Sequence, residues 1–244
     1  MKTLFLFFGL CFSLILQFPI SAYADFIPEL YSKHVRPTLT QASDQTSLAL
    51  WLSGTASVLL ARNSDNETRD TWVNHQKMSL EDAKIGERYI SYGVNIGIAG
   101  LQLWLDRANG LSHARALALT GLTTVAMKQG FARERPNQAN HHSFPSGHTS
   151  SAFATATSLT YAYGWKAGVP AFAMATWTGL SRIADDDHWL SDVVGGAFLG
   201  FIWGRAGFFQ SASSSTASPK EQAQYIVVPM ITAQSTGLVL DLHY

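Results

Sequence analysis

The stretch SRIADDDHWLSD, residues 181–192, brings a guanidinium, an imidazole and several carboxylates together. We read it as the end of one helix and the start of the next, so that His188 and Asp192 share a helix face about one turn apart. An Asp that accepts from one ring nitrogen fixes the tautomer and leaves the other nitrogen available as base or nucleophile. Arg182 adds a planar fork suited to a phosphate or carboxylate. Such a His/Asp pair is also common as a surface hydrogen bond, so its meaning depends on the rest of the chain.

The composition favours a single domain near lipid. The chain has 244 residues, enough for one domain with an ample core. It is 47% hydrophobic but only 14% charged, which is below the roughly one quarter usual for soluble domains. The mean hydropathy is +0.06. Basic and acidic residues balance at 17 each, so nothing indicates nucleic acid as a partner.

The N-terminus reads as an export signal. Lys2 precedes an apolar core at residues 4–16, and Ala-Tyr-Ala at 22–24 supplies a small-x-small cleavage site. We expect residues 1–24 to be a cleaved signal peptide, with an uncleaved anchor as the alternative. The only cysteine, Cys11, lies within it, so the mature chain would have no disulfide, which suits a bacterial periplasm.

Six runs almost free of charge follow, each about the length of a helix, and they predict an all-α six-helix bundle within a domain at 25–209. The runs are residues 48–61, 89–105, 114–127, 149–163, 171–181 and 190–204. Asp44, Thr46 or Ser47 could cap the first run. Residues 62–88 read as an exposed polar connection with one short helix near 79–84. Paired glycines such as Gly195-Gly196 suggest close helix crossings.

The tail differs from the helical part. Residues 210–223 are rich in serine and are expected to form a flexible linker. Residues 224–244 contain β-branched and alternating apolar positions around Gly237, which predicts a β-hairpin packed on the helices.

A second cluster of polar residues closes the third run. Lys128 and Arg135 are seven residues apart and share a side if the helix persists to Arg135, before Pro136 stops it. Two cations on one side repel each other unless an anion lies between them. The alternative is a solvated basic end that complements the helix dipole.

A third cluster, PSGH at 145–148, opens the fourth run. The backbone N–H groups at the start of a helix, together with the Ser146 hydroxyl, can hold an anion. Gly147 allows close approach because it has no side chain. His148 could donate a proton to a departing oxygen. An ordinary turn with an N-cap is the alternative.

These clusters should meet in space. If the third to sixth helices are joined antiparallel, the end of the third, the start of the fourth, the end of the fifth and the start of the sixth lie on one side. Coincidence is then a poor explanation for three groups of anion-binding residues.

The three clusters closely resemble the signature of the superfamily of type 2 phosphatidic acid phosphatases and vanadium haloperoxidases, which includes bacterial non-specific acid phosphatases. The signature reads here as Lys128 through Arg135-Pro136, then Pro145-Ser146-Gly147-His148, then Ser181-Arg182 through His188 to Asp192. It covers residues 128–192 directly and, through the six-helix plan, most of the mature chain. The link from Pro136 to Pro145 is short for the family, which leaves less room for a loop that grips the substrate.

The resemblance implies a role for each residue. His188 would attack phosphorus and form a phosphohistidine, Asp192 would orient it, and His148 would protonate the leaving oxygen and later help to activate water. The phosphate oxygens would be held by Lys128, Arg135, Arg182, Ser146 and the amide of Gly147. No metal or other cofactor is expected.

Two further groups of polar residues are expected to have no direct part in the reaction. Asp185, Asp186 and Asp187 suggest a metal site, but three consecutive acids rarely converge, so we expect them to be solvated or to pair with Arg182. His141 and His142 are expected to be solvated, with a contact to the leaving group as the alternative.

The expected function is that of a metal-independent phosphatase for phosphomonoesters or for lipid phosphates and pyrophosphates. A vanadate-dependent haloperoxidase and a non-catalytic anion-binding protein are the alternatives. Family members are six-span membrane enzymes or soluble periplasmic ones. The runs 114–127 and 190–204 hold about 15 residues, against about 20 for a full span. Six complete spans would also turn the site toward the cytosol. We therefore expect an exported periplasmic domain, either free or resting on a membrane, with an integral membrane protein as the alternative.

Overall fold

The computed structural model describes residues 28–86, 93–214, 224–232 and 235–243. The chain divides into two compact units, residues 1–40 and 41–244. In the described part of the first unit, the π-helical turn η1 (Tyr31–Val35) leads into α3 (Arg36–Gln41). An exposed ion pair joins Lys33 to Glu29 at 2.6 Å. The expected signal peptide, residues 1–24, lies outside the described residues.

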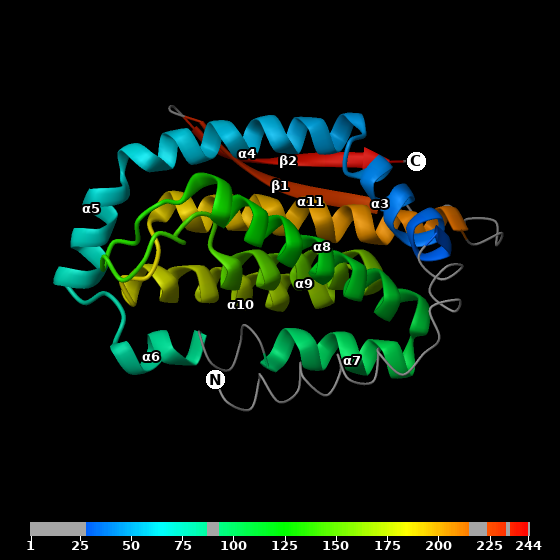
Figure 1. Ribbon diagram of the computed structural model, residues 1–244, viewed down its shortest axis with the longest axis horizontal. Helices are drawn as coiled ribbons and strands as arrows, with labels where there is room; N and C mark the ends of the chain where they lie inside the picture. Colours follow the sequence, from blue (N-terminus) through cyan, green and yellow to red (C-terminus); the bar gives the residue numbers. More distant parts are fainter. Residues whose placement is uncertain (1–27, 87–92, 215–223, 233–234, 244) are drawn as a thin grey trace. The chain divides into compact units, whose positions relative to one another are not determined.

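The second unit is mostly helical (Figure 1). Its helices are α4 (Gln45–Asn63), α5 (Asp65–Arg69), η2 (Asp70–Asn74), α6 (Leu80–Ile85), α7 (Asn95–Leu105), α8 (Arg107–Phe131), α9 (Gly147–Tyr163), α10 (Trp165–Ala184) and α11 (Leu190–Ser214). The predicted helical class is confirmed, and the described part of each of the six expected runs is helical. The count of six is not confirmed, because the described residues also form short helices.

The helices α4, α8, α9, α10 and α11 are longer than the runs predicted for them. α8 and α11 each have 25 residues, because small and polar residues continue the helix beyond the apolar run. Along the described residues, no helix is both long enough and apolar enough to cross a membrane.

Side-chain caps set several helix starts. Asp44 caps α4 by accepting a hydrogen bond from the Ser47 amide at 2.7 Å, so it is the cap among the three candidates. The Ser79 hydroxyl accepts from the Asp82 amide at 3.1 Å, and the predicted short helix near 79–84 is confirmed as α6.

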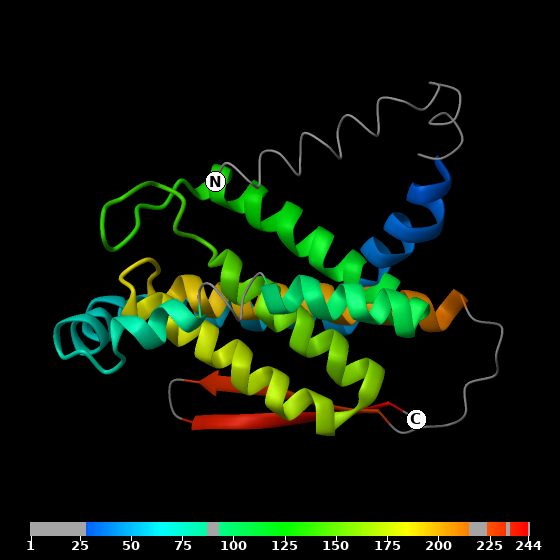
Figure 2. The same cartoon turned by 90° about the horizontal axis from the view of Figure 1, so that it is seen from below.

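α9 lies between α8 and α10, and it also packs against α11 (Figure 2). Gly196, Gly200 and Gly204 recur every fourth residue on the α11 face that meets α9. A Cβ added to any of them would come within 2.5 to 2.6 Å of α9 atoms or of the Ser146 carbonyl just before α9. The expected close crossing is therefore confirmed, and glycine is what permits it.

A buried histidine ties three helices together outside the clusters described above. The Nδ1 of His113 lies 2.6 Å from the Gln102 side-chain oxygen, and its Nε2 lies 2.9 Å from the Thr155 hydroxyl. Burial lowers the pKa of His113 to about 4, so the ring is neutral and joins α7, α8 and α9 through hydrogen bonds.

The end of α8, the start of α9, the end of α10 and the start of α11 lie at one end of these helices (Figure 1). The Ser146 amide donates to the Asp192 carbonyl at 3.0 Å, and the Asn137 amide donates to the Asp186 carbonyl at 3.1 Å. The predicted convergence is confirmed. One detail is wrong: α8 ends at Phe131, where Ala132 takes a left-handed conformation (φ 44°), so the helix does not persist to Arg135.

The C-terminal part contains two strands, β1 (Gln224–Thr232) and β2 (Ser235–His243), paired antiparallel from Gln224 opposite His243 to Thr232 opposite Ser235. They fall in the stretch where we expect a hairpin. Residues 210–214 of the expected linker belong to α11, and its remaining residues, 215–223, lie outside the described residues.

Candidate active site

His188 occupies the turn between α10 and α11 and is almost fully buried, with 2% of its surface exposed. It precedes α11, so the prediction that it shares a helix face with Asp192 is wrong. The two still meet, because Nδ1 of His188 lies 3.6 Å from Oδ2 of Asp192. Burial lowers the pKa of His188, while Asp192 opposes that shift. The ring therefore presents Nε2 on the side away from Asp192.

Asp192 is fully buried and is held by several donors. Its Oδ2 accepts from the Ser143 hydroxyl and, at 2.9 Å, from the Trp189 amide, while Oδ1 accepts from Arg133 at 2.7 Å. Burial alone would raise the pKa of Asp192, but the interactions with His188 and Arg133 outweigh it and lower that pKa. The carboxylate beside His188 is thus kept ionised.

The start of α9 brings Ser146, Gly147 and His148 to the same place. Ser146 is buried, and its hydroxyl accepts from Thr149 at 2.9 Å. A Cβ on Gly147 would make only ordinary contacts, the closest at 3.4 Å to Thr124. The pKa of His148 is lowered to about 3, first by burial and then by the positive charges of Arg182 and His188. Two imidazoles therefore act on each other within one cationic neighbourhood.

Three cations come from different segments. Lys128 of α8 donates to the carbonyls of His142 and Ser143, and its pKa is lowered to about 8 by burial and then by Arg135. Arg135 lies in the loop after α8, with Nε 3.1 Å from the Asn140 side-chain oxygen. Arg182 of α10 is fully buried and donates to the Ala83 carbonyl at 3.1 Å. These side chains surround the two histidines with positive charge.

The three consecutive acids contact three arginines, Arg69, Arg135 and Arg182. Asp185 lies 3.1 Å from Arg182. Asp186 binds Arg69 through two bonds of 2.6 and 2.7 Å, a partner that the sequence does not indicate. Asp187 lies 2.8 Å from Arg135 and 3.6 Å from Arg182, so the expectation of solvation or Arg182 pairing is only partly right. Across the described ranges, no group of three or more His, Cys, Asp and Glu residues could hold a metal ion.

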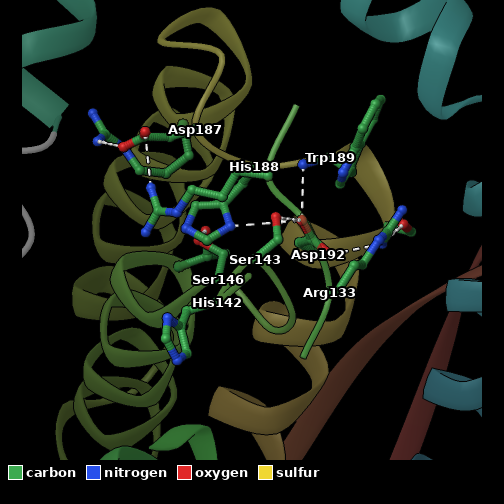
Figure 3. Close-up of polar contacts among 12 residues, drawn as sticks. Arg133, His142, Ser143, Ser146, Asp187, His188, Trp189 and Asp192 are labelled. Atoms are coloured by element: carbon green, nitrogen blue, oxygen red, sulfur yellow. Dashed lines mark hydrogen bonds and ion pairs between the residues drawn. The ribbon is translucent and has the colours of Figure 1, made fainter. Parts of the chain in front are cut away.

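Sequence reasoning missed Arg133, Asp65 and Trp189. Arg133 lies two residues before Arg135 and binds both Asp192 and Asp65 at 2.7 Å, and its position between Lys128 and Arg135 was the available signal. Asp65 is buried, although it falls in a stretch predicted to be exposed. Figure 3 shows Arg133 on the far side of Asp192 from His188, beside Trp189. The side chains of His141 and His142 are exposed.

Residues 109–213, which include all three clusters, match the sequence model of the PAP2 superfamily. Over these residues the chain is similar to the PAP2 superfamily. The resemblance drawn from the three clusters is thereby confirmed, and the PAP2 segment runs from the first turn of α8 almost to the end of α11.

Two curated proteins resemble the PAP2 segment. The lipid A 1-phosphatase of Porphyromonas gingivalis is 40% identical over 104 residues, which cover 41% of this chain and 23% of that protein. The lipid A 4′-phosphatase of Helicobacter pylori is 38% identical over 123 residues, which cover 49% of this chain and 57% of that protein. The chain thus matches less than two thirds of the length of either relative.

Two solved structures share the fold. LpxE of Aquifex aeolicus superposes with a TM-score of 0.51 at 24% identity, over 59% of this chain and 94% of that one. A transmembrane PAP2 type phosphatidylglycerolphosphate phosphatase of Bacillus subtilis superposes with a TM-score of 0.54 at 18% identity, over 72% of this chain and 98% of that one. At these identities the likeness supports the fold alone.

Proposed function

We propose that this PAP2 chain is a lipid phosphate phosphatase that works through a phosphohistidine on His188. The observation that carries the proposal is the meeting of the buried His188, the half-buried His148, an ionised carboxylate and three cations at the start of α9. Phosphoryl transfer requires mainly positioning and stabilisation of charge on the phosphate oxygens. Lys128, Arg135 and Arg182, with Ser146 and the Gly147 amide, would supply both.

The first step would be an in-line displacement. Nε2 of His188 attacks phosphorus and forms the P–N bond while the P–O bond to the leaving group breaks. Asp192 holds Nδ1 and stabilises the positive charge that develops on the ring. Water then cleaves the P–N bond, which releases phosphate and restores His188.

His148 would supply the proton for the leaving oxygen. Burial and the neighbouring cations lower the pKa of His148 to about 3, so the ring is neutral before a substrate binds. A bound phosphate carries negative charge that offsets the cations around His148, and its pKa then rises. The proton would thus be taken up with the substrate and passed to the oxygen that departs.

A lipid substrate is supported by the surroundings of the site as well as by the names of the two curated relatives. A cavity of about 370 Å³ lies between α4, α8 and α11 and is lined mainly by apolar side chains, among them Leu50, Val58, Met127, Phe131 and Phe198. Its volume falls within the range of small-molecule sites. Arg133, which binds Asp192, also lines it. An acyl chain in this cavity would lie close to a phosphate at His188.

Contact with a membrane is supported by exposed apolar side chains. Leu52 on α4, Trp104 on α7, Leu122 on α8 and Trp165 on α10 are each more than two thirds exposed. Such surfaces are typical of proteins that contact lipid or a partner. Together with the export signal expected in residues 1–24, they support a site that acts on the periplasmic side of a membrane.

The test is hydrolysis by the full chain in detergent, with EDTA present. The panel consists of a chromogenic phosphomonoester, phosphatidic acid, a prenyl pyrophosphate and lipid A, and halide oxidation with vanadate is measured in parallel. We expect phosphate release from the lipids and a phosphorylated His188 peptide after rapid quenching. His75→Ala, which changes an exposed histidine, is the control. Release of phosphate by His188→Ala at the wild-type rate would remove the proposed nucleophile.

A further inference from the structure

Asp192 is held from two sides. Its Oδ2 faces Nδ1 of His188 at 3.6 Å and accepts from the Trp189 amide at 2.9 Å. Its Oδ1 accepts from Nη1 of Arg133 at 2.7 Å. Asp192 lies between His188 and Arg133 in Figure 3. Any group that fixes Arg133 therefore also fixes the carboxylate that faces His188.

Arg133 is itself fixed by Asp65 of α5. Nη2 of Arg133 donates to Oδ2 of Asp65 at 2.7 Å. Asp65 also accepts from the amide and the hydroxyl of Ser191, at 2.9 and 2.7 Å, and that hydroxyl accepts from Nη1 of Arg133 at 2.7 Å. The side chains of Asp65 and Asp192 are 6% and 0% exposed. These interactions form a closed network that joins α5, the loop after α8 and the first turn of α11, with both carboxylates buried and the Arg133 side chain 24% exposed.

We infer that Arg133 and Asp65 are positioning residues, which act on the reaction by fixing the orientation and the charge of Asp192. A carboxylate can turn about its terminal bond, whereas a planar guanidinium with two bound acceptors cannot turn without breaking hydrogen bonds. Asp65 lies outside the segment matched by the family model, residues 109–213. The inference rests on the proposed function, because the orientation of Asp192 affects turnover only if His188 reacts.

Arg133 also supplies a positive charge that two buried carboxylates share, since it binds both Asp65 and Asp192. Without Arg133, Asp192 would lose the cation that binds its Oδ1, and a carboxyl group that loses a nearby positive charge has a higher pKa. The other charged groups that act on Asp192 are His188 beside it and Lys128 of α8. Loss of Arg133 removes one cause of the lowered pKa of Asp192. The proposed reaction needs an ionised Asp192. As the pH is lowered, activity would therefore begin to fall at a higher pH in the variant than in the wild type.

The test is the pH dependence of kcat/KM for the full chain in detergent, measured with a chromogenic phosphomonoester. In Arg133→Gln we expect kcat/KM to fall about 10- to 100-fold, the size of loss known when a group that orients a metal ligand from behind is removed. The apparent pKa of the acid limb of the profile should rise by about one unit. Arg133→Lys keeps the positive charge but loses the planar guanidinium that binds two acceptors. We therefore expect kcat/KM to fall, while the apparent pKa of the acid limb changes much less.

Asp65→Asn separates positioning from loss of folding. With Asp65 neutral, the charge of Arg133 acts on Asp192 alone, so we expect kcat/KM to fall without any rise of the acid limb. Arg69→Gln is the matched control, because Arg69 also lies over the Trp189 ring, at 5.9 Å against 5.6 Å for Arg133, but pairs with Asp186. It should leave the acid limb unchanged. The midpoint of thermal unfolding, measured for every variant, shows how much of each loss of activity comes from a less stable fold.

The inference would be overturned if the acid limb of Arg133→Gln had the same apparent pKa as that of the wild type. It would also be overturned if the loss of activity in all the variants were proportional to their loss of thermal stability. Failure of the proposed function would be seen separately, as a wild-type chain that hydrolyses none of the panel. In that case the Nδ1 proton of His188, observed by NMR, still reports its contact with Asp192. A signal that is the same in wild type, Arg133→Gln and Arg69→Gln would reject the positioning role.

Discussion

Two carboxylates flank His188, and they are held in opposite ways. Asp192 is fully buried, and its oxygens are bound by Arg133, Ser143 and the Trp189 amide. Asp187 keeps 26% of its side chain exposed and is shared between Arg135 at 2.8 Å and Arg182 at 3.6 Å. Asp192 is fixed by groups that the proposed reaction does not otherwise use. Asp187 instead binds two of the cations expected to hold the phosphate.

The difference indicates which of the two acids must give way to a substrate. The donors around Asp192 can stay in place throughout the proposed reaction, because they lie behind His188. Those around Asp187 cannot all do so, since a phosphate on Arg135 and Arg182 would compete for the same N–H groups. The surroundings differ too, because Arg133 on the Asp192 side lines the apolar cavity. The predictions below test this comparison.

The largest effect is expected at Asp192. Asp192→Asn keeps the shape of the side chain but removes the charge that orients and stabilises the His188 ring. We expect kcat to fall by about a thousandfold or more, as for the equivalent change in a serine protease triad, while calorimetry still detects binding of inorganic phosphate. A loss smaller than tenfold would mean that Asp192 is not the partner that matters.

The next effect concerns the cavity on the Asp192 side. Val58→Trp should fill part of the cavity and raise KM for a long-chain lipid phosphate about tenfold, the value for losing burial of about two methylene groups. KM for a short phosphomonoester should not change. Ala56→Trp is the control, since Ala56 lies on the same helix but is exposed and does not line the cavity. Equal changes in KM for both substrates would argue against an acyl chain in the cavity.

A smaller effect is expected in proton linkage. The pKa of His148 is lowered to about 3, and that of His188 is also lowered. A bound dianion raises both values, so binding takes up protons and affinity increases as pH falls, by less than tenfold per pH unit for each proton. Sulfate binding, followed by calorimetry between pH 5 and 8, tests this because sulfate does not titrate there. His148→Gln should flatten the dependence, and a flat wild-type profile would contradict the expectation.

The smallest effect is expected at Asp187. Asp187→Asn removes a partly exposed competitor for Arg135 and Arg182, so the inhibition constant of inorganic phosphate should fall about two- to fivefold, the value of a weak ion pair. Asp186→Asn is the matched control, because Asp186 binds Arg69 instead. If Asp187→Asn weakens phosphate binding, Asp187 positions the two arginines and does not compete with the ligand.

Much of the site could be predicted because its residues are close in sequence to the helix ends that carry them. His188 and Asp192, and likewise Ser146 to His148, are separated by so few residues that one local turn brings each group together. Lys128 and Arg135 were predicted to meet for the wrong reason, since α8 ends at Phe131. Their approach depends on the loop after α8, whose path no helical periodicity describes.

The sequence by itself determined the family, the helical class and the three clusters, because short spacings and apolar runs act through local geometry. Only the tertiary structure decided which carboxylate each arginine binds and that Asp65 belongs to the site. Asp65 lies 126 residues before Ser191, in a stretch that composition alone marks as solvated. The pairing of buried charges is set by how α5, α10 and α11 pack, and that packing depends on long-range contacts that no local pattern in the chain specifies.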